Sequence, residues 1–137
     1  MRNSRYRYSR LVMVIGAITF GINALWLLIS PEGFAQYIGL ESGPTNEWAF
    51  RMLGVILVGL AVHQSATSRQ VPDKVFKRAA IVMIFVSLSL SYLTYIAPGE
   101  IDTGRWVFIT IGALFGLLYA ITLPIKSIGI LEEEPQS

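Results

Sequence analysis

The sequence predicts an all-α integral membrane protein, a single domain built as a four-helix bundle. Hydrophobic residues make up 53% of the 137 residues and charged residues only 15%, whereas a soluble globular domain carries roughly 25% charged residues. Three stretches of 19 or 20 residues contain no charged side chain at all. These two observations exclude an ordinary water-soluble domain, and the segments between the apolar stretches are too short to form a second core.

Residues 11–29 form the first predicted span. A bilayer core about 30 Å thick needs roughly 20 apolar residues of helix, because every backbone polar group must be satisfied within the segment. Arginines before an apolar run also resemble a secretory signal peptide, but this run exceeds the roughly 7 to 15 residues of a signal's apolar region. We therefore expect a retained span, ended by Pro31.

The segment after the first span is predicted to lie outside the membrane. Residues 34–40 have the pattern of a short amphipathic helix at the membrane surface. Glu32, Glu41 and Glu47 lie in this segment, but three well-spaced carboxylates define no coordination geometry. We expect a solvated acidic surface, with cation binding as the alternative, and we expect no metal and no cofactor elsewhere.

Residues 48–67 form the second predicted span, which carries Arg51 one turn in and becomes polar after His63. We include it because an odd number of spans would break the charge asymmetry described below. His63 is interpreted as an interfacial polar residue, with a proton relay as the alternative. Residues 79–97 and 106–125 are uncharged and form the third and fourth spans.

The positive charges predict the orientation. Cationic side chains flank one end of the spans: Arg2, Arg5, Arg7, Arg10, Arg69, Lys74, Lys77 and Arg78. The two opposite loops are acidic apart from a single Arg105. Because Lys and Arg are enriched in cytoplasmic loops, we expect a multi-pass protein of the cell membrane with both termini in the cytoplasm. Aromatic residues cluster near the other boundary, as an interfacial belt would: Trp26, Trp48, Tyr92, Tyr95 and Trp106.

The two halves of the chain resemble each other, which suggests two repeated helical hairpins. Trp48-x-Phe50 is followed by Gly54, and Trp106-x-Phe108 is followed by Gly112 at the same spacing. Parallel repeats about an axis along the membrane normal are known in transporters. Tryptophan anchors and glycines are also common in unrelated membrane helices, so chance similarity is the alternative.

Arg51 is the most conspicuous candidate for a ligand site, because a charge inside a membrane helix is costly and either reaches the surface or finds a partner. Glu47 is one turn earlier and would set the position of the arginine. Asn23 is the natural second partner because it is the only amide in the first span. With Tyr92 as a further hydrogen-bond partner, these residues would form an anion or lipid head-group site.

Small residues predict where helices pack. Gly112 and Gly116 form a GxxxG motif, and Ser87 and Ser91 recur at helical spacing in the preceding span. Such residues let membrane helices approach closely and share hydrogen bonds. We expect the GxxxG motif to make a contact within the chain, with a dimer contact as the alternative.

The sequence lacks the motifs of common enzymes. It has no nucleophile elbow, no phosphate-binding glycine loop and no HExxH metal motif. It has no cysteine, which excludes thiolate chemistry. The basic residues flank apolar runs instead of forming a patch on a polar face, so we expect no nucleic-acid partner.

Several residues in the first half of the chain carry a resemblance to a known family. Pro31-Glu32, Gly39-Leu40 and Arg51-Met52-Leu53-Gly54 with Gly59 resemble small DoxX-like four-helix membrane proteins. The resemblance implies a four-helix membrane fold and, by likeness to the name-giving members, an accessory role in a quinone-linked oxidoreductase. Most such families have no assigned role.

The sequence predicts a non-enzymatic membrane component that acts through helix-helix contacts with itself or with a larger membrane complex. Membrane lipid is its other predicted partner. Close-packing seams without catalytic groups support this prediction. The alternatives are a small carrier or lipid-binding or anion-binding protein using Arg51, and the redox accessory role.

Overall fold

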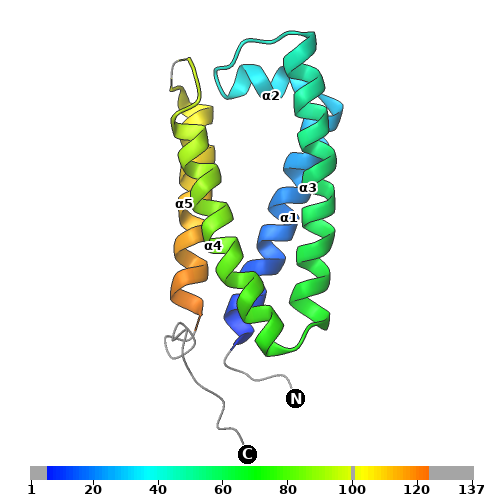
Figure 1. The fold of residues 1–137 in the computed structure, drawn as a ribbon. Helices are drawn as coiled ribbons and strands as arrows, with labels where there is room; N and C mark the ends of the chain where they lie inside the picture. The colour runs from blue at the N-terminus through cyan, green and yellow to red at the C-terminus, as the bar shows by residue number, and fades with distance from the viewer. Residues whose placement is uncertain (1–5, 100, 124–137) are drawn as a thin grey trace, which may run out of the picture.

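The computed structural model describes residues 6–99 and 101–123, and these residues form five helices (Figure 1). The helices are α1 (Arg7–Ile29), α2 (Pro31–Tyr37), α3 (Pro44–Gln70), α4 (Asp73–Tyr95) and α5 (Thr103–Thr122). All except α2 are long and apolar enough to cross a membrane. The prediction of an all-α bundle with four such helices is confirmed. Several residues of the sequence predictions lie outside the described residues: Arg2, Arg5, Glu100 and the last two residues of the fourth span.

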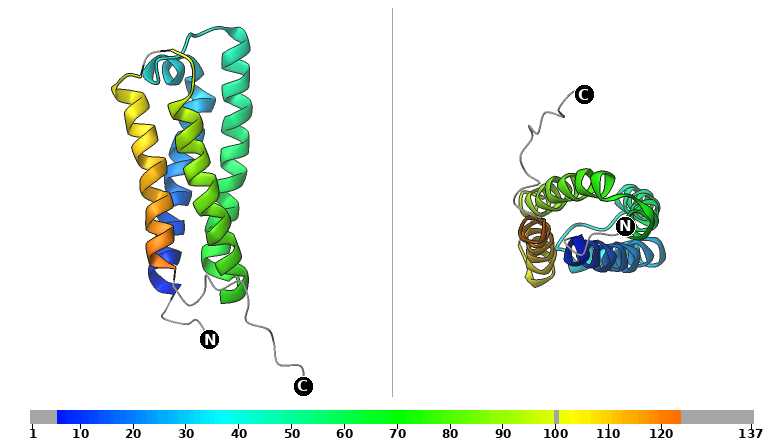
Figure 2. Two further views of the ribbon diagram at one scale, coloured as in Figure 1. Left: turned by 60° about the vertical axis from the view of Figure 1, so that its left-hand side comes forward. Right: turned by 90° about the horizontal axis from the view of Figure 1, so that it is seen from below.

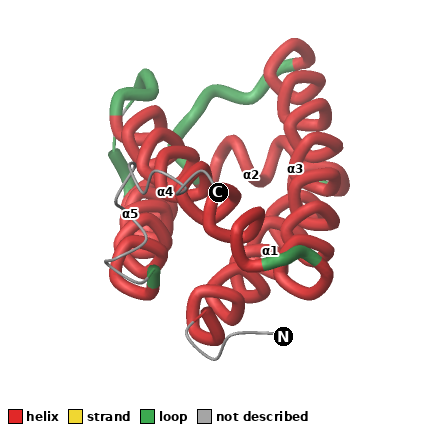
Figure 3. Tube along the Cα trace, turned by 60° about the horizontal axis from the view of Figure 1, so that its bottom comes forward, coloured by secondary structure: helices red, strands yellow, loops and turns green. Residues whose placement is uncertain are grey.

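The four long helices form two antiparallel hairpins, one from α1 and α3 and the other from α4 and α5 (Figure 1). We call the end with both chain termini the terminal end, and the opposite end the α2 end. Only two residues connect α3 to α4 at the terminal end, whereas a six-residue loop joins α2 to α3 (Figure 3). Seen along the bundle, the long helices enclose a central space rather than forming a flat layer (Figure 2).

The hairpins converge at the terminal end and diverge toward the α2 end. A buried cluster joins them near the termini, with Met13 of α1, Phe76 and Met83 of α4 and Tyr119 of α5 in contact. At the other end, Leu27 and Leu57 of the first hairpin pack with Phe34 of α2. The helix α2 therefore fills part of the space between the diverging hairpins.

Arg10 closes the terminal end. Its guanidinium donates hydrogen bonds to the carbonyl oxygens of Ser68 at 2.8 Å and Val71 at 2.9 Å. It also forms an ion pair of 2.8 Å with Asp73 and lies 4.5 Å from the ring centre of Phe76. The carbonyls at a helix C-terminus lack partners within the helix. Arg10 thus ties α1 to the junction of α3 and α4.

The predicted packing residues lie between α4 and α5. A Cβ atom at Gly112 would lie 3.0 Å from the carbonyl oxygen of Ser87, and one at Gly116 would lie 2.7 Å from the Leu88 side chain. The Ser91 hydroxyl donates a 2.7 Å hydrogen bond to the carbonyl of Ile109 across the same interface. The GxxxG motif therefore faces a helix of its own chain.

The first hairpin uses a glycine in the same way. A Cβ atom at Gly54 would lie 3.2 Å from the carbonyl oxygen of Ala24 and 2.9 Å from the Leu28 side chain of α1. Gly54 and Gly112 hold equivalent places in the repeated sequence pattern. Each of them brings the second helix of its hairpin close to the first.

Candidate functional site

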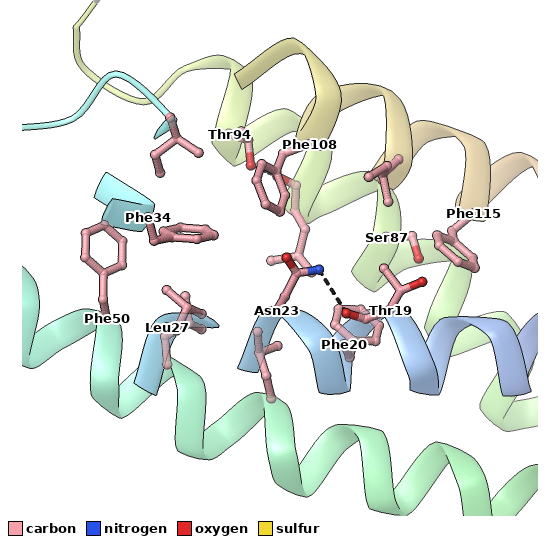
Figure 4. A pocket seen from close by; sticks show the side chains of 16 residues that line it. Thr19, Phe20, Asn23, Leu27, Phe34, Phe50, Ser87, Thr94, Phe108 and Phe115 are labelled. Carbon is pink, nitrogen blue, oxygen red and sulfur yellow. Dashed lines mark hydrogen bonds between the residues drawn. The ribbon is translucent and has the colours of Figure 1, made fainter. Parts of the chain in front are cut away.

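An apolar cavity of about 210 Å³ lies between the two hairpins, next to α2 on the side of the terminal end (Figure 4). All five helices contribute to its wall, so the cavity exists only when both hairpins and α2 are in place. Five phenylalanine side chains line it: Phe20, Phe34, Phe50, Phe108 and Phe115. This number of aromatic rings suits an apolar or aromatic occupant.

Phe34 of α2 contacts both hairpins at the α2 end of the cavity. Its ring meets Phe50 of α3 at a centroid distance of 5.5 Å and Phe108 of α5 at 5.2 Å, both edge-on. Edge-to-face contacts at these distances are favourable for aromatic pairs. Phe50 and Phe108 are the phenylalanines of the repeated Trp-x-Phe motif, so the repeat supplies the same residue to the cavity from each hairpin.

Four polar side chains also line the cavity: Thr19, Asn23, Ser87 and Thr94. The hydroxyls of Thr19 and Thr94 donate to the carbonyls of Ile15 and Leu90, one turn earlier in their own helices. The amide nitrogen of Asn23 donates to the carbonyl of Thr19 at 2.9 Å (Figure 4). These bonds fix the side chains of Thr19, Asn23 and Thr94 without using a neighbouring helix.

Arg105, in the first turn of α5, holds α2 over the cavity. Its side chain is only 1% exposed, and its guanidinium donates to five backbone carbonyls at 2.8 to 3.3 Å. The acceptors are Ile38, Gly39, Ala97, Pro98 and Gly99. Among the described residues no carboxylate forms an ion pair with this guanidinium. Arg105 therefore joins the end of α2 to the loop between α4 and α5.

Glycines make the Arg105 contacts possible. Gly39 and Gly99 have φ angles of 67° and 93°, which only glycine adopts readily. A Cβ atom at Gly104 would overlap the carbonyl of Tyr37 at the end of α2. The N-terminus of α5 can approach α2 this closely only because Gly104 has no side chain.

The structure does not bring the predicted ligand residues together. Asn23 lines the cavity, but Arg51, Tyr92 and Glu47 are not part of its lining. Arg51 and Tyr92 are exposed, Tyr92 at 63%. Arg51 lies in the second turn of α3, where an arginine can reach the interfacial region and needs no interior partner. A ligand role for these residues stays a prediction.

A second cavity of about 230 Å³ lies nearer the terminal end and is lined by His63 and Gln64 of α3 and Met83 of α4. Gln64 donates only to the sulfur of Met83, a weak acceptor. Within the described residues, the Gln64 Oε1 and Tyr119 hydroxyl oxygens are buried without a hydrogen-bond partner. Both lie beside Gly16, 3.2 and 3.3 Å from the position of a Cβ atom there.

Phe34, which lines the cavity, and Arg105, which holds α2 over it, are the main functional residues that the sequence analysis did not identify. A signal for Arg105 was present, because it is the one cation in two otherwise acidic loops and is preceded by Gly99 and Gly104. The described residues contain no group of three or more side chains that could hold a metal ion. No family model, curated protein or solved structure matches the chain.

Proposed function

We propose that this chain is a non-enzymatic, multi-pass protein of the cell membrane that binds a small apolar molecule from the bilayer. The cavity between the hairpins is the observation that carries the proposal. A site walled by five phenylalanines and four uncharged polar residues has the composition of a small-molecule pocket, mostly apolar with few polar groups.

The volume of the cavity sets the size of the ligand. An engineered apolar protein cavity of about 150 Å³ binds benzene. A cavity of about 210 Å³ thus has room for one six-membered ring with small substituents. A whole phospholipid is too large, although one end of a lipid chain would fit.

The position of two leucines supports entry from the bilayer. Leu53 of α3 and Leu90 of α4 line the cavity, and their side chains are also 37% and 38% exposed. Cavity-lining side chains with this much accessible surface fit a cavity that is open beside α3 and α4. A ligand dissolved in lipid would enter between α3 and α4 without crossing water.

Ligand binding is tested with p-xylene and the protein in lipid nanodiscs. p-Xylene at about 100 times its dissociation constant should stabilise the folded protein by about 2.7 kcal/mol, seen as a rise in the unfolding temperature. Thr94→Phe should abolish the rise, because Thr94 lines the cavity and the larger ring fills it. Thr110→Phe is the matched control, since Thr110 is exposed on α5. An equal rise in both variants would contradict the proposal.

Association with another membrane protein is the second candidate function. In the most apolar 18-residue segment of α3, only 11% of the residues are buried. Its residues Val55, Ile56 and Val62 are each more than 60% exposed. An apolar helix face of this kind suits either lipid or a partner helix. Chemical cross-linking in native membranes checks this role, and a chain that remains monomeric and co-purifies with nothing would contradict it.

A further inference from the structure

We infer that the ligand of the cavity carries a hydroxyl group, as a phenol or a ring-bearing alcohol does, and that this hydroxyl binds Asn23. The inference rests on the proposed binding function and adds the chemical class of the ligand. It follows from the hydrogen bonds of Thr19, Asn23 and Thr94, which are three of the four polar residues that line the cavity.

The hydroxyl donors of the two threonines are already used. Thr19 and Thr94 direct their hydroxyl hydrogens to carbonyls of their own helices, at 3.0 and 2.7 Å. A hydroxyl has one donor and two acceptor lone pairs. These side chains therefore offer acceptors to a ligand and no further donor.

Asn23 offers both kinds of group. Its amide nitrogen uses one hydrogen on the Thr19 carbonyl, which leaves a second hydrogen. The described residues provide no donor to its Oδ1 atom, since Asn23 makes no hydrogen bond other than the one to Thr19. These two groups of Asn23 remain available on the cavity wall, so a ligand that both donates and accepts matches them.

A hydroxyl group meets these requirements, and a charged head group does not. It can donate its one hydrogen to Oδ1 of Asn23 and accept from the amide nitrogen. No charged side chain lines the cavity, and an ion without a partner is strongly disfavoured in such a place.

The arrangement of the rings fits a hydroxyl attached to a ring. In Figure 4, Phe34 and Phe50 lie to the left of Asn23, Phe108 lies above it, and Phe20 and Phe115 lie to its right. A ligand ring placed beside Phe34, Phe50 and Phe108, at the α2 end of the cavity, would make edge-to-face contacts like those between Phe34 and its neighbours. The hydroxyl of this ligand would then point toward the terminal end, where Asn23 lies.

A matched pair of probes tests the inference. p-Cresol and p-xylene have nearly the same shape, but p-cresol has a hydroxyl where p-xylene has a methyl. We expect p-cresol to bind the protein in nanodiscs several-fold to about tenfold more tightly, at equal concentration in the bilayer, which is the effect of one net hydrogen bond. Asn23→Leu should remove the preference, while p-xylene still binds.

The outcomes separate the inference from the binding function. If p-xylene binds and p-cresol shows no preference, or if Asn23→Leu leaves the preference unchanged, the hydroxyl inference is wrong and the cavity still binds apolar molecules. If neither probe binds the unaltered protein, the binding function itself is wrong. Retained binding of p-xylene shows that the Asn23→Leu variant is folded.

Discussion

At the scale of single residues, the Arg105 side chain makes more hydrogen bonds than any other side chain among the described residues. Its five acceptors are backbone carbonyls from two loops. A buried carbonyl left without a partner costs roughly 1–3 kcal/mol. Removing the guanidinium leaves the buried carbonyl of Ile38 without this partner and breaks four partly buried hydrogen bonds beside it, which links Arg105 to the stability of the α2 end.

Arg105→Met should lower the free energy of unfolding by about 3 kcal/mol or more. Arg105→Lys should rescue only part of this loss, because an ammonium has three donors on one atom and cannot reach five acceptors. Arg51→Met is the matched control on an exposed arginine and should change stability by no more than about 0.5 kcal/mol. Denaturant unfolding in detergent micelles measures all three, and equal effects of the Arg51 and Arg105 variants would contradict the assignment.

Two glycines of α1 should respond in opposite ways to alanine. A Cβ atom at Gly16 would crowd the buried oxygens of Gln64 and Tyr119, whereas one at Gly21 would meet nothing within 4 Å. Gly21→Ala should therefore stabilise the protein by about 0.5–1 kcal/mol, the usual gain of alanine over glycine inside a helix. Gly16→Ala should lose this gain or destabilise. Thermal unfolding of the two variants compares them, and an equal gain in both would show that Gly16 is not crowded.

At the scale of elements, α2 is the part of the fold that the sequence predicts least accurately. The amphipathic pattern predicts a helix over residues 34–40, but the helix begins at Pro31 and ends at Tyr37. Proline ends α1 and also begins α2, because a first helical position needs no backbone N–H. The pattern alone does not reveal that Pro31, Phe34 and Ala35 are buried against the bundle.

The attachment of α2 should depend on Gly104. In Gly104→Ala the new methyl group cannot fit beside the Tyr37 carbonyl, so α2 should separate from α5. Hydrogen exchange should then become faster in residues 31–43 and stay unchanged in α1 and α4. Gly43→Ala, in the loop that follows α2, is the control, since a Cβ atom there meets nothing within 4 Å. Unchanged exchange in the Gly104 variant would mean that α2 is held elsewhere.

The sequence predicts some site residues and misses others for a physical reason. Asn23 is recognisable because it is the only amide in an apolar span. Arg105 stands out only as the one cation of two acidic loops. Its role cannot be predicted, because its partners are main-chain carbonyls that no side-chain pattern marks, two of them 66 and 67 residues away along the chain. Arg51 attracts attention as a charge in a span, but its position near the helix end leaves it exposed.

At the scale of the whole molecule, the apolar runs determine most of the fold. Hydrophobicity over about 20 residues is a local property, so the four long helices can be located from the sequence. The separation of the hairpins cannot, since it depends on Phe34, Arg105 and the glycines at the α2 end acting together. The cavity is therefore a property of the tertiary structure.

The charge distribution predicts that the terminal end faces the cytoplasm. The chain has no cysteine, so single cysteines can be introduced without removing others. In intact cells, a membrane-impermeant maleimide should label Ser42→Cys, at the α2 end, but not Gln70→Cys, at the terminal end; both residues are exposed. Permeabilised cells should show labelling of both. The opposite pattern in intact cells would reverse the orientation.

The Arg105 contacts also bear on how this fold tolerates mutation over time. Main-chain carbonyls are present whatever the side chain, so Ile38, Ala97 and Pro98 can be exchanged without loss of an acceptor. The restriction falls on the arginine and on Gly39 and Gly99, whose positive φ angles aim two of the carbonyls. Homologues of this protein should thus retain Arg105, Gly39 and Gly99, while the residues between them vary.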